Sequence, residues 1–244
     1  MNPDWIVPDW PAPAAVRAFV TTRAGGVSEG PYAEMNLGAH VGDSPEAVLR
    51  NRTLLRNALP AEPFWLDQVH GVAVADAGAD AGAVVADASV ARRPGEVCAI
   101  MTADCLPVLF CDAAGSVVAA AHAGWRGLVA GVLEACIAHM RVPAATLMAW
   151  LGPAIGPGVF EVGSEVRAAF VTADPRAEEA FRPAAQSGKW LADLFLLARL
   201  RLAKAGVRQV SGGGLCTYSN PDRFYSYRRD GRTGRFASLI WMER

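Results

Sequence analysis

The chain has 244 residues, a net charge of -1 and a pI of about 6.4. This length suits one domain with a large buried core, and we expect a single domain over residues 1–244. The nearly neutral charge offers no basic field for nucleic-acid phosphates, so nucleic acid is excluded as a first choice of partner.

Two further classes of protein are disfavoured. No run of about 18 uncharged apolar residues occurs, and no basic segment followed by an apolar run opens the sequence, so we expect neither membrane spanning nor secretion. The five cysteines form no C-x-x-C pair. An odd, unpatterned set is typical of reduced thiols, and we therefore expect a cytoplasmic protein without disulfides.

The first half of the sequence predicts short strands and one helix. Residues 16–22 indicate a strand that ends at a Gly-Gly turn. Ser44, Pro45 and Glu46 supply the N-cap, first-turn proline and early acid of a helix that Pro60 closes. Further strands are expected at 64–69, 72–75, 97–103, 106–111 and 117–122. The turn at 112–115 predicts that the last two form an antiparallel hairpin.

The second half predicts more helix. Apolar residues from Leu128 to Met140 recur at helical spacing, which indicates one helix beginning near Gly124. The remaining elements are expected as a strand at 147–151, an irregular loop at 152–158, helices at 164–173 and 190–205, a loop-rich tail at 212–235 and a strand at 236–242. Hairpins interrupted by helices favour an α+β fold, with mixed or antiparallel sheets flanked by helices.

Three side chains point to metal chemistry. His70 and His122 stand at ends of predicted strands beside glycine, and Cys105 interrupts an apolar run. Imidazole and thiolate are the ligands that zinc prefers, and three protein ligands leave a fourth position open, as in catalytic sites. The same residues fit a second interpretation, in which Cys105 is a nucleophile, His70 or His122 its base and Asp104 the group that orients them. Spacing alone does not separate the two.

The other titratable and aromatic residues are less specific. His40 and His139 are expected at the surface, and Cys98, Cys111 and Cys136 in the core. The tail from Cys216 to Arg235 mixes aromatics with arginines, which can stack on a flat base and clamp a phosphate, although a solvated loop with internal ion pairs has the same composition. Its four clustered arginines suit a small anion better than a duplex; they are Arg228, Arg229, Arg232 and Arg235.

Seven segments in fixed order resemble the YfiH family, also called laccase-domain or polyphenol oxidase-like proteins. They are TRAGGVS (22–28), MNLG (35–38), QVHG (68–71), TADCLP (102–107), HAGWRG (122–127), GPAIG (152–156) and YSYRRD (225–230). The resemblance covers about residues 17–242. It implies an α+β fold, likened to the catalytic domain of cytotoxic necrotizing factor toxins, and zinc bound by His70, Cys105 and His122.

The resemblance also implies an activity on small molecules. Members are described as phosphorolysing adenosine, inosine, guanosine and methylthioadenosine, and as deaminating adenosine, so purine nucleosides and phosphate are the expected partners. An older claim is copper-dependent oxidation of phenols, which keeps copper open as the metal. The chain has four histidines in all, which is too few for a multicopper centre. The sequence specifies no oligomeric state.

Phosphorolysis requires groups that bind phosphate and sugar. Arg23, Arg126 and Arg228 are our candidates for phosphate, because a guanidinium can pair with two oxygens at once. Asn36 and Gln68 are candidates for the sugar or base.

Two other residues complete the expected site. Tyr225 is a further substrate contact, and Asp104 is a candidate proton carrier in deamination.

A cysteine hydrolase, for instance an amidase on a cell-wall precursor, is the main alternative. A noncatalytic partner-binding protein that uses the aromatic tail is a third possibility.

Overall fold

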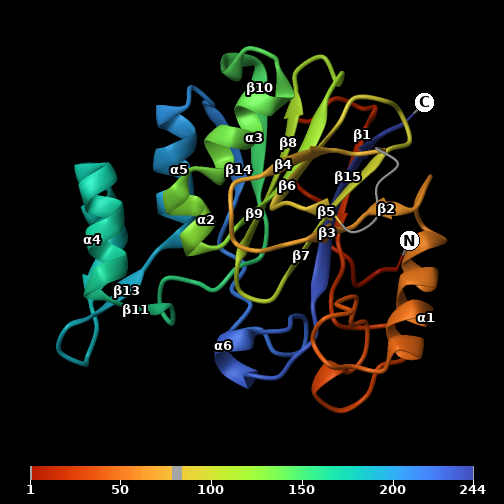
Figure 1. Ribbon diagram of the computed structural model, residues 1–244, viewed down its shortest axis with the longest axis horizontal. Helices are drawn as coiled ribbons and strands as arrows, with labels where there is room; N and C mark the ends of the chain where they lie inside the picture. The colour runs from red at the N-terminus through yellow and green to blue at the C-terminus, as the bar shows by residue number, and fades with distance from the viewer. Residues whose placement is uncertain (1, 79–83, 244) are drawn as a thin grey trace.

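The computed structural model describes residues 2–78 and 84–243, and its centre is a pair of β-sheets packed face to face (Figure 1). The six-stranded sheet has the order β14-β10-β8-β9-β6-β4, and the four-stranded sheet has the order β1-β15-β7-β2. Both sheets contain parallel and antiparallel neighbours. The predicted α+β architecture with mixed sheets is thus confirmed.

The strands of the six-stranded sheet are β4 (Val74–Asp76), β6 (Ala88–Ala91), β8 (Leu106–Asp112), β9 (Val118–Ala123), β10 (Leu147–Leu151) and β14 (Gln209–Gly212). The strands of the four-stranded sheet are β1 (Val16–Val20), β2 (Pro63–Phe64), β7 (Val97–Thr102) and β15 (Phe236–Met242). Two short strands, β3 (Leu66–Asp67) and β5 (Val84–Val85), pair in parallel beside them.

Apolar side chains fill three spaces between four layers. Leu109, Ile100 and Ile240 are fully buried in the core between the two sheets. Helices α2 (Trp125–Ala130), α3 (Val132–Met140) and α5 (Leu194–Lys204) cover the outer face of the six-stranded sheet. Helix α1 (Pro45–Arg56) covers the outer face of the four-stranded sheet, where Leu55 packs against Phe19.

A smaller subassembly extends beyond α5 in Figure 1. It consists of α4 (Ser164–Ala173), the 3-10 helix η3 (Pro175–Ala180) and a three-stranded antiparallel sheet of β11 (Glu161–Gly163), β12 (Phe181–Pro183) and β13 (Lys189–Ala192). Two short 3-10 helices, η1 (Gly30–Tyr32) and η2 (Ala144–Thr146), and α6 (Tyr227–Asp230) complete the fold.

Several predicted elements need correction. The helix expected from Gly124 to Met140 is two helices, because Gly131 has a φ of 104° and ends α2. The helix expected from residue 190 begins at Leu194, where Asp193 accepts a hydrogen bond from the Leu196 amide and caps it. Residues 64–69 form two short strands rather than one, and β5 and β6 at 84–91 were not predicted.

Other predictions hold closely. The β8–β9 hairpin is antiparallel, with Leu106 opposite Ala123, and β15 spans the expected residues. The five cysteines are free thiols, and Cys98, Cys111 and Cys136 are buried as expected. His139 is partly exposed and pairs with Asp76.

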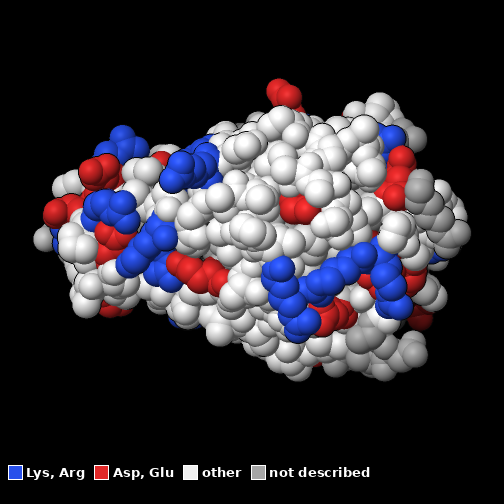
Figure 2. Space-filling view, turned by 90° about the horizontal axis from the view of Figure 1, so that it is seen from above, with Lys and Arg blue, Asp and Glu red and all other residues white. Residues whose placement is uncertain are grey.

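Within the described residues, no helix is long and apolar enough to cross a membrane. On the face shown in Figure 2, basic side chains lie beside acidic ones.

Asn51 connects α1 to the long segment between β1 and α1. Its buried amide donates to Ser28 Oγ and to the carbonyls of Glu34 and Asn36, and accepts from the Val27 amide. An unpaired buried polar group costs about 1–3 kcal/mol.

We predict that Asn51→Ala lowers the free energy of unfolding by about 2–4 kcal/mol, because it leaves several backbone groups unpaired at once. Urea denaturation followed by circular dichroism measures this change. The matched control is Arg50→Ala, an exposed change on the same helix, which is expected to stay within about 0.5 kcal/mol. Equal effects of the two substitutions would contradict the role of Asn51.

Candidate metal centre and active site

The structure brings His70, Cys105 and His122 together. One ligand atom from each lies within 4.8 Å of the others, and Cys105 Sγ is 3.6 Å from His70 Nε2. His70 lies in the loop between β3 and β4, Cys105 at the turn between β7 and β8, and His122 on β9. His122 therefore comes from the β8–β9 hairpin, and Cys105 lies directly before this hairpin begins. The turn after β3 supplies His70.

A buried carboxylate, Asp87, fixes two of these groups. Asp87 Oδ1 is 2.8 Å from His122 Nδ1 and accepts the His70 amide, while Oδ2 accepts the amides of Val69 and Gly71. Since the Nδ1 proton of His122 is used by the carboxylate, Nε2 is the nitrogen left to bind a metal. In zinc sites a ligating histidine usually donates its other ring N–H to a carboxylate or a carbonyl, which orients the ring.

The three groups can approach closely because residue 124 is glycine. A Cβ atom on Gly124 would lie 2.8 Å from Cys105 Sγ and 2.8 Å from His70 Cδ2. Its φ of -63° is ordinary for any residue. The glycine is therefore required here for space rather than for backbone conformation.

The charges of the site favour a thiolate. Burial disfavours the Cys105 thiolate, but His122 and His70 outweigh this effect and lower the pKa of Cys105 to about 6. Burial likewise opposes the His122 cation, but the Cys105 thiolate and Asp87 raise the pKa of His122 to about 9. A deprotonated sulfur flanked by imidazoles is the form in which cysteine binds metals.

This donor set fits zinc. Two imidazoles and one thiolate belong to zinc's preferred ligands, and three protein groups are the number found in its catalytic sites. The carboxylate on His122 adds the orienting contact that such sites use. The residues present could therefore hold the metal that the family resemblance implies, with His70, Cys105 and His122 as its ligands.

A cavity of about 390 Å³ opens directly onto these three residues. Aromatic side chains of Trp125, Phe160 and Tyr227 contribute to its wall, and Tyr227 is 62% exposed. Its basic residues are His40, Arg126, Arg228 and Arg235. Flat apolar surfaces combined with cations are suited to an aromatic ligand that carries or accompanies an anion.

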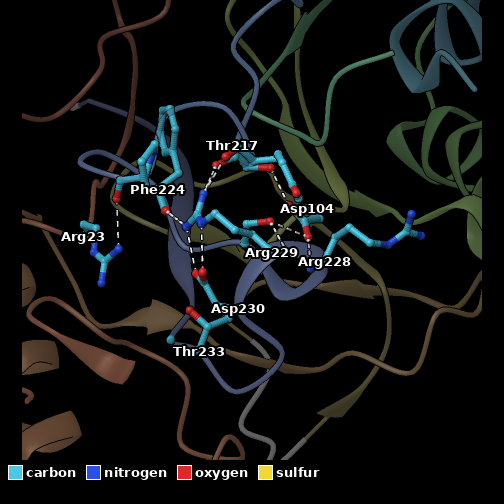
Figure 3. A network of polar contacts seen from close by, with 12 residues as sticks. Arg23, Asp104, Thr217, Phe224, Arg228, Arg229, Asp230 and Thr233 are labelled. Carbon is cyan, nitrogen blue, oxygen red and sulfur yellow. Dashed lines mark hydrogen bonds and ion pairs between the residues drawn. The ribbon is translucent and has the colours of Figure 1, made fainter. Parts of the chain in front are cut away.

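Asp104 ties the C-terminal loop to the metal centre (Figure 3). Its carboxylate accepts hydrogen bonds from Thr217 Oγ1, Ser226 Oγ and the Arg228 amide. The backbone of Asp104 has a φ of 95°, which turns the chain sharply into Cys105. These contacts support a positioning role for Asp104, while its role as a proton carrier stays a prediction.

Arg229 organises the same loop from within. Its guanidinium donates to the carbonyls of Thr217, Tyr218 and Phe224 and pairs with Asp230 (Figure 3). The Arg228 guanidinium points away from this network and donates to the Glu161 carbonyl. The two neighbouring arginines thus have different tasks: one is structural and the other faces the cavity.

Three predicted substrate contacts lie away from the cavity wall, which corrects the sequence-based site. Arg23 donates to the carbonyls of Ala33 and Pro221. Tyr225 is fully buried, with its hydroxyl on the Tyr32 carbonyl. Asn36 is also fully buried, and its amide pairs with neighbouring loops. The hydrogen-bonding groups of Tyr225 and Asn36 are used inside the fold, and Arg23, which is partly exposed, donates to loop carbonyls outside the cavity wall.

The other predicted contacts do line the cavity. Arg126 is exposed and stacks over the Trp125 ring at 4.4 Å. Arg228 lies over the Phe160 ring at 5.3 Å. Gln68 also contributes to the wall, but its amide pairs with both the N–H and the carbonyl of Met101.

Some residues of the site were missed in the sequence. Asp87 interrupts an apolar run between β5 and β6, a signal that buried acids share with many ordinary turn residues. Trp125 and Phe160 carry no local pattern that distinguishes them from core aromatics. His40 was expected at the surface; it is exposed but lies at the cavity wall.

The sheets, the metal-ligand set and the adjoining cavity define a candidate metalloenzyme with an α+β fold. A family model described as multi-copper polyphenol oxidoreductase laccase matches residues 17–243, and the chain belongs to this family. The match confirms the family resemblance seen in the sequence motifs.

Close relatives carry a different name. "Purine nucleoside phosphorylase PA4543" of Pseudomonas aeruginosa is 60% identical over 240 residues, covering 98% of both chains. "Purine nucleoside phosphorylase YfiH" of Escherichia coli K12 is 55% identical over 241 residues, covering 97% of this chain and 98% of the relative.

Solved structures agree with the fold. Protein NMB0706 of Neisseria meningitidis superposes with a TM-score of 0.95 at 55% identity, covering 99% of this chain and 100% of the other. YlmD of Geobacillus stearothermophilus gives a TM-score of 0.93 at 30% identity, covering 100% and 98%.

We predict that Asp87→Asn weakens zinc binding by about 10- to 100-fold, because an amide replaces the carboxylate that orients His122 and the His70 loop. Competition with a chromophoric chelator measures the affinity. Asp222→Asn, an isosteric change at an exposed position, is the control and is expected to bind zinc like the wild type. Unchanged zinc affinity in Asp87→Asn would refute the orienting role.

Gly124→Ala is expected to weaken the same metal site by steric means. The added methyl group would overlap Cys105 Sγ and His70 Cδ2, so zinc affinity should fall by about tenfold or more while the charges of the ligands stay the same. Gly158→Ala is the matched control, because no atom lies within 4 Å of its added Cβ. Equal zinc affinity of the two variants would show that the close approach at Gly124 is not required.

Proposed function

We propose that this protein is a zinc-dependent purine nucleoside phosphorylase that also deaminates adenosine. Its substrates are adenosine, inosine, guanosine and methylthioadenosine, which react with phosphate to give the free base and ribose 1-phosphate or its methylthio counterpart. The observation that carries the proposal is the His70, Cys105 and His122 set opening onto a cavity lined by aromatic rings and arginines. Two relatives named purine nucleoside phosphorylase support it.

The cavity residues divide naturally among the parts of the substrates. Trp125, Phe160 and Tyr227 offer flat faces for a purine, and stacking is tolerant of which purine is present. Arg126 and Arg228 supply guanidinium groups that can pair with phosphate oxygens and hold them near the sugar. Positioning of two reactants in one cavity removes much of the entropic barrier of their reaction.

Zinc, when bound by the three ligands, supplies a Lewis acid at one end of this cavity. The protein's own contribution is to fix the ligands. Asp87 keeps the Nδ1 proton of His122 and leaves Nε2 free. Asp104 keeps the loop with Tyr227 and Arg228 against the cavity, and its proposed part in moving a proton during deamination depends on releasing one of these hydrogen bonds.

A cysteine hydrolase is the second candidate. The distance of 3.6 Å between Cys105 Sγ and His70 Nε2, and the low pKa of the thiol, are also what a nucleophilic cysteine needs. It differs from the first candidate in keeping its activity without a metal. Copper is a further alternative for the ion, because two histidines and a cysteine also form blue-copper sites.

The decisive test compares the wild type with Cys105→Ala. Purified proteins are incubated with inosine or adenosine and phosphate, the products are separated by chromatography, and zinc and copper are quantified. We expect free base and ribose 1-phosphate from the wild type, and a loss of at least about 100-fold in turnover together with the metal in Cys105→Ala. Cys216→Ser, a partly buried cysteine outside the cavity, is the control.

Two results would contradict the proposal. A zinc-loaded wild type that converts no purine nucleoside would refute phosphorolysis. Turnover that survives complete removal of the metal, with a covalent adduct on Cys105, would establish the cysteine hydrolase instead.

A further inference from the structure

The three arginines at the cavity differ in how their charges are compensated. Arg126 and Arg228 are exposed to solvent, whereas Arg235 is partly buried. Among the described residues, the Arg235 guanidinium donates only to the carbonyls of Thr233 and Gly234, 3.1 and 2.9 Å away, in its own loop. None of the ion pairs within residues 2–78 and 84–243 includes Arg235.

The main chain of Arg235 is also held in place. The Arg235 backbone N–H donates to Asn36 Oδ1 at 2.8 Å, and its carbonyl accepts from the Leu37 amide at 3.0 Å. Its stem passes so close to Gly38 that a Cβ there would lie 2.8 Å from Arg235 Cγ. Asn36 is therefore a positioning residue for Arg235.

Another basic group accompanies Arg235 at the cavity wall. His40 lies shortly after Gly38, against which the Arg235 stem packs, and it lines the same cavity as Arg235. Burial, then the charge of Arg235, lowers the pKa of His40.

A cation partly removed from water without a counter-ion loses solvation free energy that a bound anion restores. Burial lowers the pKa of Arg235, and the negative charges of Cys105 and Asp104 offset this effect only in part. The guanidinium nevertheless stays charged at neutral pH. Here the His40 imidazole lines the same cavity, and an oxyanion with several acceptor oxygens can accept hydrogen bonds from both side chains. Phosphate has this chemistry.

We propose that Arg235 is the principal anchor of the phosphate cosubstrate, in a subsite that it shares with His40. The inference deepens and rests on the proposed phosphorolysis. Arg126 and Arg228 lie over aromatic rings at the more exposed wall of the cavity. We therefore expect these two arginines to contribute less to phosphate affinity than Arg235.

The test measures phosphate binding apart from turnover. Isothermal titration of the zinc-loaded full chain with inorganic phosphate is compared for the wild type, Arg235→Gln and Arg235→Lys. We expect Kd to rise by about tenfold or more in Arg235→Gln and less in Arg235→Lys, which keeps the charge but loses the two-pronged geometry. Arg223→Gln, an exposed arginine of the same loop, should bind phosphate like the wild type.

Steady-state kinetics give the second readout. In Arg235→Gln the KM for phosphate should rise by a similar factor, while the KM for inosine, the zinc content and the thermal unfolding temperature stay at wild-type values. A phosphate Kd unchanged in Arg235→Gln, or no phosphate binding by the wild type, would overturn the subsite. A wild type that binds phosphate through Arg235 but converts no nucleoside would instead refute the proposed function alone.

Discussion

The carboxylate of Asp87 is the constraint on which the metal centre depends. It is completely buried, and its two oxygens bind one imidazole and three consecutive backbone amides from another segment. Burial of a charge is costly unless hydrogen bonds compensate it. Here the compensation comes from the groups that the site needs in fixed positions, so the stability of the carboxylate and the geometry of the ligands have the same origin.

A second carboxylate, Asp104, performs the corresponding task on the other side of Cys105. It receives hydrogen bonds from the C-terminal loop, and Arg229 fills the interior of that loop with donors to backbone carbonyls. Loops lack the regular hydrogen-bond ladders of helices and strands, so side chains must satisfy their backbone groups. The hydrogen bonds of Asp104 and Arg229 accordingly hold the loop that brings Tyr227 and Arg228 to the cavity wall.

The sequence predicted the parts of the fold that local patterns determine. The β8–β9 hairpin and β15 have alternating or continuous apolar runs bounded by turn residues, and they were located within a residue or two. The sequence did not predict the helix break at Gly131 or the short strands β11 to β13. One glycine within an apolar stripe and strands of three or four residues give only weak sequence signals.

The residues of the candidate site also differ in how clearly the sequence reveals them. His70, Cys105 and His122 could be found because histidine and cysteine are rare here, whereas Asp87 is one of 24 acidic residues and has no distinctive spacing. Tyr225 and Asn36 lie in motifs beside functional residues, but their side chains turn into the fold. Sequence identifies the segments that build the cavity; which side chain of a segment faces it depends on tertiary packing.

The position of β15 has a consequence for how the protein is made. This strand, near the end of the sequence, lies between β1 and β7 and pairs with both. During synthesis β1 emerges early and has no sheet partner until β15 leaves the ribosome. The loop that brings Tyr227, Arg228 and Arg235 to the cavity directly precedes β15. His70, Cys105 and His122 are therefore synthesised well before Tyr227, Arg228 and Arg235, so the cavity wall is incomplete until the segment before β15 has been made.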